Sequence, residues 1–234
     1  MKPIKKMPAV ISHINDLSTT AREVEITLPE PLGFTAGCFV NVFIDKNGEK
    51  LRRAFSVSSD ESEQQKIKVS IRLNPTGAVT PLFWEDGIIG KAIEVMGPLG
   101  LNTAEKMNSK KIYLFGFEIG AGVVKSLASH FINKAGVTNI TILTGNRSEA
   151  EILHQDYFDK IKTEHKQVLV EYILSQPDAN NIYKTGYIQN HLAEFDFNDS
   201  DVYVCGQTAA CEALIKTVKE HNPTNCNYFV EDFH

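Results

Sequence analysis

The sequence has few residues that could hold a metal ion or an iron–sulfur cluster. Its four cysteines are Cys38, Cys205, Cys211 and Cys226, with no C-x-x-C pair and no histidine at zinc-ligand spacing. Any redox chemistry would therefore need a bound organic cofactor. An even number of cysteines could form two disulfides, but a chain of this size does not need them, so we expect reduced thiols.

Long apolar runs and an excess of basic residues are also missing. No apolar run approaches the ~18 residues that cross a bilayer. The N-terminal segment 1–6 contains basic residues, but the apolar stretch of a signal peptide does not follow them. The 24 Lys and Arg against 29 Asp and Glu give a net charge of −5, which argues against binding nucleic acid. We therefore expect a cytoplasmic protein with no membrane span and no nucleic-acid partner.

The 234 residues, 42% of them hydrophobic, can form one large domain or two compact ones at about 150 residues per domain. The pattern of segments changes near residue 105, which favours two. We place the first domain at residues 1–104 and the second at 105–234.

The first half is built from short, often β-branched segments separated by turn residues such as Asp45–Gly48 and Asn74–Gly77. The predicted strands are residues 10–14, 22–28, 39–44, 53–58, 67–73 and 92–95. They predict an antiparallel six-stranded Greek-key β-barrel. A short helix is expected after the fifth strand, with Thr80 as its N-cap and Pro81 in its first turn.

In the second half, strand-like and helical segments alternate. The predicted strands are residues 112–117, 139–144, 168–174, 202–205 and 227–230, and the predicted helices are 123–135, 149–162 and 208–221. This order predicts an α/β domain with a parallel five-stranded sheet, whose ligands bind at the carboxyl ends of the strands.

Two segments of the barrel half could together bind an anion. Arg53-Ala-Phe-Ser56 offers a guanidinium fork and a hydroxyl, and Gly77-Ala-Val-Thr80 offers a close backbone approach at the start of a helix. Taken alone, each segment is more often a surface strand or a simple turn.

Three further features lie in the second half. Gly116–Gly122 joins a strand to a helix, where a pyrophosphate could rest, although Glu118 would repel it unless it turns outward. Cys205-Gly206 ends a strand and could line a flat ligand, or Cys205 could simply be buried. Glu231 and Phe233 share a face of a terminal strand and could reach a site, or they could belong to a frayed tail.

The order of these features resembles the ferredoxin-NADP reductase superfamily of flavoprotein reductases. The family's R-x-[Y/F]-[S/T], G-x-x-[S/T], Gly-rich loop and C-G match Arg53–Ser56, Gly77–Thr80, Gly116–Gly122 and Cys205-Gly206 in turn. The end of the chain, residues 230–233, is similar to the family's V-E-x-aromatic. Residues 96–100 and 144–148 add further likeness, so the resemblance spans nearly the full length.

The resemblance implies bound FAD and NAD(P)H. Arg53 would contact the FAD pyrophosphate, Phe55 would pack on the isoalloxazine, and Ser56 would approach its N5. The implied cofactor-binding residues of the barrel are Arg53, Ala54, Phe55, Ser56, Ile71, Arg72, Leu73, Gly77, Ala78, Val79 and Thr80. Those of the second half are Gly116, Gly120, Arg147, Ser148, Cys205, Gly206 and Phe233.

The resemblance also implies which residues serve hydride transfer, namely Ser56, Cys205, Glu231 and Phe233. Cys205 would lie beside the nicotinamide, and Glu231 would assist the charge and proton balance at the flavin edge. Phe233 would cover the ring face and move away when nicotinamide stacks there.

The nucleotide loop departs from the family pattern G-x-G-[I/A]-[T/A]-P. The matching stretch is Glu118-Ile-Gly-Ala-Gly-Val123, which gains a carboxylate and loses a proline. These changes put nucleotide affinity in doubt. Arg147 and Ser148 match positions that hold the 2′-phosphate of NADP in relatives, but the second basic residue near residues 174–176 is absent, so NADP is only slightly favoured.

The resemblance implies an electron acceptor on a separate protein, because the four spaced cysteines of the iron–sulfur domain in some relatives are missing. A flavodoxin or ferredoxin is the expected partner. Lys46, Lys50 and Arg52 could dock it, although such residues are more often only solvated. Two alternatives stay open: a flavin-binding docking subunit that does not use pyridine nucleotide, and a protein without cofactor.

Overall fold

The first half of the chain folds into one antiparallel sheet of six strands. In this computed structural model, which describes residues 3–233, the strand order is β4-β3-β6-β1-β2-β5. The strands are β1 (Lys5–Asp16), β2 (Ala21–Thr27), β3 (Phe39–Lys46), β4 (Glu49–Ser56), β5 (Lys66–Arg72) and β6 (Ala92–Leu99). The six predicted strands and their antiparallel pairing are confirmed.

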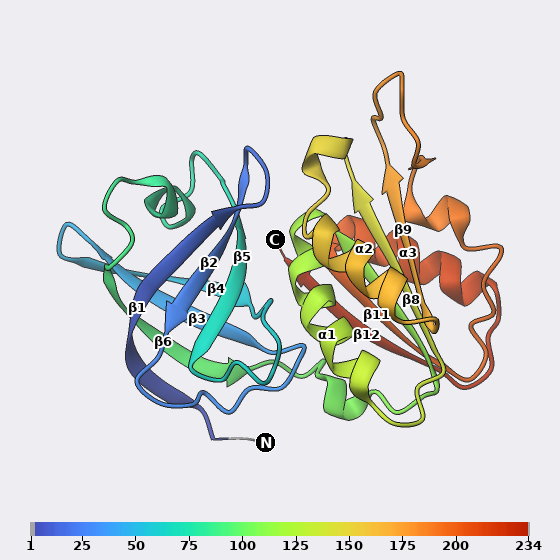
Figure 1. Cartoon of the computed structure of the whole chain (residues 1–234), viewed down its shortest axis with the longest axis horizontal. Helices are drawn as coiled ribbons and strands as arrows, with labels where there is room; N and C mark the ends of the chain where they lie inside the picture. Colours follow the sequence, from blue (N-terminus) through green and yellow to red (C-terminus); the bar gives the residue numbers. More distant parts are fainter. Residues whose placement is uncertain (1–2, 234) are drawn as a thin grey trace.

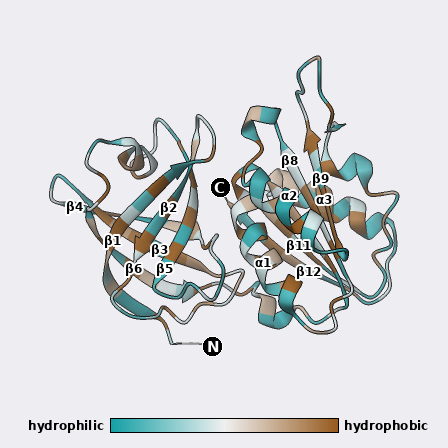
Figure 2. Cartoon of the chain, viewed as in Figure 1, coloured by the Kyte–Doolittle hydropathy of each residue, from teal (hydrophilic) through white to brown (hydrophobic). Residues whose placement is uncertain are grey.

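The sheet curls around its own core, and buried and partly exposed side chains alternate along its strands. Val40, Val42 and Ile44 of β3 are fully buried, while the residues between them are partly exposed. An antiparallel bridge between Val57 and Val69 joins the end of β4 to β5, so the two outer strands of the sheet meet. Figure 2 shows the hydrophobic positions recurring along these strands. The barrel therefore presents the ends of β4 and β5 together.

The short helix after β5 differs in detail from the prediction. It is a 3-10 helix, η1 (Thr80–Trp84), and its N-cap position is Val79, with no side-chain cap. The Thr80 hydroxyl oxygen instead accepts the backbone N–H of Asn74 at 2.9 Å. Predicting Thr80 as the N-cap was therefore wrong, because its hydroxyl closes the preceding loop.

The second half forms a parallel sheet in the order β10-β9-β8-β7-β11-β12, with helices on its faces (Figure 1). Its strands are β7 (Lys111–Phe117), β8 (Asn139–Asn146), β9 (Val168–Leu174), β10 (Lys184–Thr185), β11 (Ser200–Gln207) and β12 (Cys226–Phe233). Its α-helices are α1 (Ala121–Asn133), α2 (Gln155–Glu164) and α3 (Thr208–Glu220), and its 3-10 helices are η2 (Ala104–Lys106), η3 (Glu118–Gly120), η4 (Glu149–Glu151) and η5 (Ile188–His191). None of the helices in the described part of the chain is long and apolar enough to cross a membrane.

Two predictions for this half need correction. The sheet has six strands rather than five, because the two-residue β10 pairs with Ile173 and Leu174. A Lys-Thr pair carries no alternation that could reveal a strand. The predicted helix at 149–162 is divided into η4 and α2, because His154 between them has a left-handed φ of 57°.

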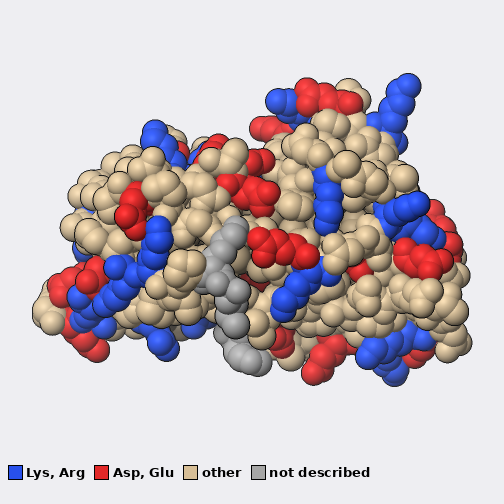
Figure 3. All heavy atoms as spheres, turned by 90° about the horizontal axis from the view of Figure 1, so that it is seen from below, with Lys and Arg blue, Asp and Glu red and all other residues tan. Residues whose placement is uncertain are grey.

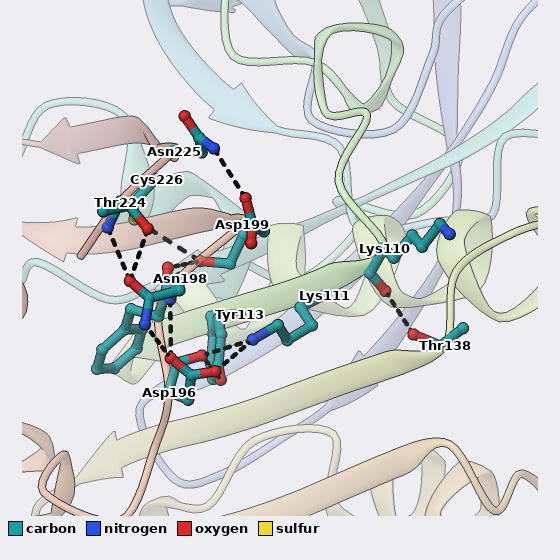
Figure 4. Close-up of polar contacts among 12 residues, drawn as sticks. Lys110, Lys111, Tyr113, Thr138, Asp196, Asn198, Asp199, Thr224, Asn225 and Cys226 are labelled. Atoms are coloured by element: carbon teal, nitrogen blue, oxygen red, sulfur yellow. Dashed lines mark hydrogen bonds and ion pairs between the residues drawn. The ribbon is translucent and has the colours of Figure 1, made fainter.

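The amino ends of β7 and β11 are held by structural polar contacts (Figure 4). Lys111 Nζ lies 2.7 Å from an Asp196 carboxylate oxygen, and the Tyr113 hydroxyl donates to the Asp196 carbonyl at 2.8 Å. Asn225 donates to Asp199 at 2.9 Å. The opposite, carboxyl ends of the parallel strands face the barrel.

A buried polar network joins the two halves. The Lys125 ammonium of α1 lies 2.7 Å from the Glu23 carboxylate of β2, and both side chains are less than one-sixth exposed. Glu23 also accepts the Ser58 hydroxyl at 3.0 Å, and Ser70 of β5 contacts His154 Nε2 at 2.9 Å. This network fixes α1 and the segment before α2 against the barrel.

Protonation in this network follows from burial and charge. Burial and the nearby Lys125 ammonium lower the pKa of His154 to about 3, so its imidazole is neutral at pH 7. Burial alone would raise the pKa of Glu23, but Lys125 and its other partners lower it overall. The interface therefore holds an ion pair beside a neutral histidine.

Candidate functional site

A cavity of about 1250 Å³ lies between the barrel and the carboxyl ends of the parallel strands. Five groups of residues line most of it: residues 52–56 of β4, 70–74 at the end of β5, 117–119 and 122–123 around the start of α1, 145–147 after β8, and 231–233 of β12. The rest of the wall is formed by residues 186–189 and 207–210 and by Phe39, Asn41, Thr80, Ser175 and Ala213. The cavity thus gathers segments from both halves of the chain.

Most of the predicted barrel residues line this cavity. They are Arg53, Ala54, Phe55, Ser56, Ile71, Arg72, Leu73 and Thr80. The Phe55 ring is largely buried and meets Phe83 edge-on at 5.7 Å. Gly77, Ala78 and Val79 are not among the lining residues, and Val79 instead packs into the barrel core.

Ser56 and Glu231 meet across the two halves. The Ser56 hydroxyl of β4 hydrogen-bonds one carboxylate oxygen of Glu231, and the Tyr203 hydroxyl of β11 donates to the other at 2.9 Å. Burial raises the pKa of the Glu231 carboxyl, although both hydroxyls favour its charged form. This arrangement places a titratable carboxyl at the junction of the domains.

Tyr203 is the residue of this junction that the sequence prediction missed. Its side chain is fully buried, and burial raises the pKa of its phenol well above the usual value. It lies two residues before Cys205, so both side chains share one face of β11. A phenol inside an otherwise apolar strand was the signal that could have identified it.

Cys205 lies beneath the cavity wall. Its side chain is fully buried and, like Gly206, it is not among the lining residues. Burial raises the pKa of the Cys205 thiol well above its usual value, so the thiol stays protonated and is a poor nucleophile. Phe233 lines the cavity, pairs with Gln207 of β11 and packs against the core cluster that includes Cys205.

The glycines after β7 let α1 begin close behind the strands. A Cβ added to Gly116 would lie 3.0 Å from the Ala121 nitrogen, and one added to Gly120 would collide with the Cys205 carbonyl. Neither glycine lines the cavity, whereas Gly122 does. Among the described residues no side chain caps the start of α1, which continues directly from η3, and the Ala121 N–H donates to the Glu118 carbonyl. The positive end of the α1 dipole still points toward this side of the cavity.

Glu118 lies at the cavity wall and turns toward the barrel. It adopts a left-handed φ of 50°, and its carboxylate lies 3.4 Å from Nε of Arg72. Arg72 also contacts Glu151, with Nη1 2.9 Å from its carboxylate, and donates to the Thr20 hydroxyl at 3.0 Å. The carboxylate in the nucleotide loop is thus paired with a cation of the other half.

Of the two residues predicted to hold a 2′-phosphate, Arg147 lines the cavity and Ser148 does not. Arg147 Nε donates to the Gln176 side chain at 2.8 Å. Tyr187, which the sequence prediction missed, also lines this part of the cavity and is 60% exposed. A planar ring at the cavity rim suits an aromatic ligand.

Two family models together match most of the chain. The oxidoreductase FAD-binding domain matches residues 8–103, and the oxidoreductase NAD-binding domain matches residues 119–219. The chain belongs to the ferredoxin-NADP reductase superfamily. Its first half is thus the flavin-binding half of such a reductase, and its second half the nucleotide-binding half.

Individual relatives of this superfamily are distant in sequence. The reductase component of phenol 2-monooxygenase from Pseudomonas sp. (strain CF600) is 24% identical over 99% of this chain and 67% of its own length. The reductase subunit of an aromatic O-demethylase from Amycolatopsis sp. (strain ATCC 39116 / 75iv2) is 25% identical over 93% of this chain and 66% of its own. The chain therefore spans about two thirds of the length of these curated relatives.

Solved structures show the same fold. The Amycolatopsis cytochrome P450 reductase GcoB superimposes with a TM-score of 0.87 at 22% identity, covering 98% of this chain and 71% of that chain. The ferredoxin reductase in carbazole 1,9a-dioxygenase gives a TM-score of 0.84 at 16% identity, covering 97% of this chain and 70% of that chain.

The residues of the cavity fit the two cofactors of the family. Its volume of about 1250 Å³ exceeds the ~300–1,000 Å³ of a typical single-ligand pocket. Arg53 supplies a cation on the barrel side, Phe55 an aromatic surface, and the α1 start an uncapped helix N-terminus. The described residues contain no group of three or more His, Cys, Asp or Glu that could hold a metal.

Proposed function

We propose that this protein is an FAD-dependent reductase that takes electrons from NAD(P)H and delivers them to a separate protein. The observation that carries the proposal is the contact between Ser56 and Glu231, which joins the flavin-binding strand to the nucleotide-binding half inside one cavity. We also propose that the two domains divide at residues 104 and 105. Both family models support this division, since one ends at 103 and the other begins at 119.

Each half would contribute binding and placement. Arg53 would hold the flavin pyrophosphate, and Phe55 and Ser56 would contact the ring. FAD supplies the conversion of a two-electron hydride donor into one-electron steps. Glu231, with its raised pKa, would exchange a proton at the Ser56 hydroxyl, while Phe233 would cover the ring face until nicotinamide takes its place.

The electron acceptor would be a separate carrier or oxygenase protein. The phenol 2-monooxygenase and O-demethylase reductases favour an oxygenase system, and a flavodoxin or ferredoxin remains the alternative. Of the predicted docking residues, Lys50 is paired with Glu94 at 2.7 Å, and Arg52 lines the cavity. Figure 3 shows positive and negative side chains interspersed on one face, which gives little support to a strongly basic docking surface.

A second function is favoured by Glu118. A carboxylate in the nucleotide loop opposes phosphate binding, so the protein could instead be a flavin-binding subunit that does not use pyridine nucleotide. Such a subunit would serve as a docking or regulatory partner in a larger complex.

An anaerobic spectral titration of the purified, FAD-loaded protein tests both functions. We expect the flavin absorbance to bleach on addition of NADH or NADPH, and the more effective nucleotide gives the preference. NADPH is slightly favoured by Arg147. A yellow protein that neither nucleotide bleaches would support the docking subunit, and a colourless protein that does not take up FAD would reject both.

A further inference from the structure

Glu118 occupies a backbone conformation that suits glycine. Its φ of 50° is left-handed, which costs a residue with a Cβ about 1 kcal/mol or more. It is followed within three residues by the start of α1, and it lines the cavity. A strained residue that places a charge in a binding cavity points to a role in what the cavity accepts.

The partner of Glu118 comes from the barrel. Arg72 Nε lies 3.4 Å from the Glu118 carboxylate, but Nε and Nη2 are buried without a hydrogen-bond partner among the described residues. The contact is therefore an ion pair without good hydrogen-bond geometry. By contrast, Arg72 Nη1 is hydrogen-bonded to both Glu151 and Thr20. Arg72 is thus anchored by Glu151, and Glu118 is the more weakly held of its two carboxylates.

The charges near the α1 start do not cancel. One guanidinium faces two carboxylates, of which Glu118 lines the cavity and Glu151 does not. The positive end of the α1 dipole favours a nearby phosphate, whereas the Glu118 carboxylate a few residues earlier repels it. The two effects act on the same ligand group at the same end of α1.

We propose that Glu118 is a specificity-determining residue that selects against a diphosphate on the nicotinamide-nucleotide side of the cavity, and that Arg72 limits this effect by drawing the Glu118 carboxylate toward the barrel. The inference rests on the proposed function, since it concerns the nucleotide side of that site. It implies that a dinucleotide binds only weakly in spite of the positive end of the α1 dipole. A hydride donor without phosphates would be unaffected by Glu118.

The test measures binding of ADP-ribose, which carries the diphosphate but no nicotinamide, to the FAD-loaded protein by calorimetry. In Glu118→Gln we expect the Kd to fall about five- to tenfold at low ionic strength, with a smaller difference in high salt. Arg72→Gln should raise the Kd, because both carboxylates lose their cation. Glu118→Gly removes the charge and the backbone strain together and should bind at least as tightly as Glu118→Gln.

Glu151→Gln is the matched control. It removes a carboxylate from the same guanidinium but outside the cavity, so its Kd should change less than twofold. Flavin reduction by dihydronicotinamide riboside, which has no phosphate, should proceed at the same rate in the parent protein and Glu118→Gln, while the KM for NADH falls.

Failure of this inference can be told apart from failure of the proposed function. An unchanged ADP-ribose Kd in both Glu118 variants would overturn the inference, as would an equal effect on NADH and on the riboside. A flavin that neither NADH nor the riboside reduces would overturn the proposed function, whereas tighter ADP-ribose binding in the same variants would still support the role of Glu118.

Discussion

Glu231 stands between two hydroxyl groups that come from different halves of the chain. Ser56 and Tyr203 each hydrogen-bond one of its carboxylate oxygens, yet burial still raises its pKa. A buried carboxyl of this kind is expected to titrate above the usual value of 4.5. Its protonation state should therefore be visible in the pH dependence of the reaction.

We expect Glu231→Gln to slow flavin reduction by NAD(P)H by about ten- to a hundredfold, because general acid–base groups typically contribute at least this much. The parent protein should show an inflection above pH 4.5 in the single-turnover rate, and the variant should lack it. Stopped-flow absorbance across a pH series provides the measurement. Glu220→Gln, at an exposed carboxylate outside this cavity, is the control. A parent and a Glu231 variant with the same pH profile would remove Glu231 from the proton path.

For single residues, the sequence predicted which residues belong to the site better than it predicted where their side chains lie. Ser56 and Glu231 were both expected near the flavin, but their contact joins residues 175 positions apart and depends on how the two halves pack. Cys205 was expected either beside the nicotinamide or simply buried, and the structure shows it completely buried. The sequence could not decide between the two, because the backbone of Gly120 packs against Cys205 only in the folded domain. Their functional roles remain predictions.

Helix α1 approaches the barrel through Gly122. A Cβ at this position would lie 2.5 Å from the Ser70 hydroxyl oxygen and 2.8 Å from its Cβ. This is also the position where the family pattern has Thr or Ala. In this protein the Ser70 side chain lies where the Cβ of such a residue would be. The absence of a side chain at residue 122 lets the first turn of α1 touch β5.

We expect Gly122→Ala to lower the free energy of unfolding by about 1–2 kcal/mol, even though alanine favours a helix by nearly 1 kcal/mol. Overcrowding against Ser70 should outweigh the helix preference. Urea unfolding measures the effect. The cost should be smaller in a Ser70→Gly background, since the atoms that collide are then absent. A Gly122→Ala protein more stable than its parent would contradict the close contact.

Among the elements, the regular ones were predictable and the short ones were not. Most strands of both sheets follow alternating or continuous apolar runs, which are strong signals. The two-residue β10 and the break at His154 arise from local backbone geometry, for which the sequence offers no periodic pattern.

At the scale of the whole molecule, a buried network of Glu23, Lys125, His154, Ser58 and Ser70 helps to join the two halves. Removing one member of a buried ion pair leaves the other charge without a partner, which is strongly unfavourable. The ionised Glu23 favours a proton on the near nitrogen of His154, which leaves Nε2 to accept the Ser70 hydroxyl. The neutral state of His154 is thus part of the domain interface.

This arrangement predicts a pH dependence of stability. The pKa of His154 is about 3 in the folded protein and 6.5 in an unfolded chain, so between these values the unfolded chain binds the extra proton. Stability should rise with pH across this window and fall on acidification, by about 2 kcal/mol between pH 6.5 and 5. Above about pH 7.5, where the unfolded histidine is almost fully deprotonated, the contribution should be constant.

Urea unfolding between about pH 5 and 7 provides the measurement, since carboxylates with lowered pKa values such as Glu23 titrate below this range. His154→Asn, which tolerates a left-handed backbone, should show a flatter dependence than the parent protein. His13→Asn, at an exposed histidine, should leave the slope of the free energy of unfolding against pH unchanged. Equal slopes in the parent and His154→Asn would argue against a buried neutral imidazole.

The close packing of Gly122 against Ser70 limits the exchange of domains between relatives. A nucleotide-binding half with threonine or alanine at the position of Gly122 would bring a side chain where this barrel leaves no room. A chimera of this barrel with such a half would have to tilt or separate its two parts, and the Ser56 and Glu231 contact would be the first to stretch. The two halves of this chain are therefore matched to each other, and a successful chimera would need a smaller residue at position 70.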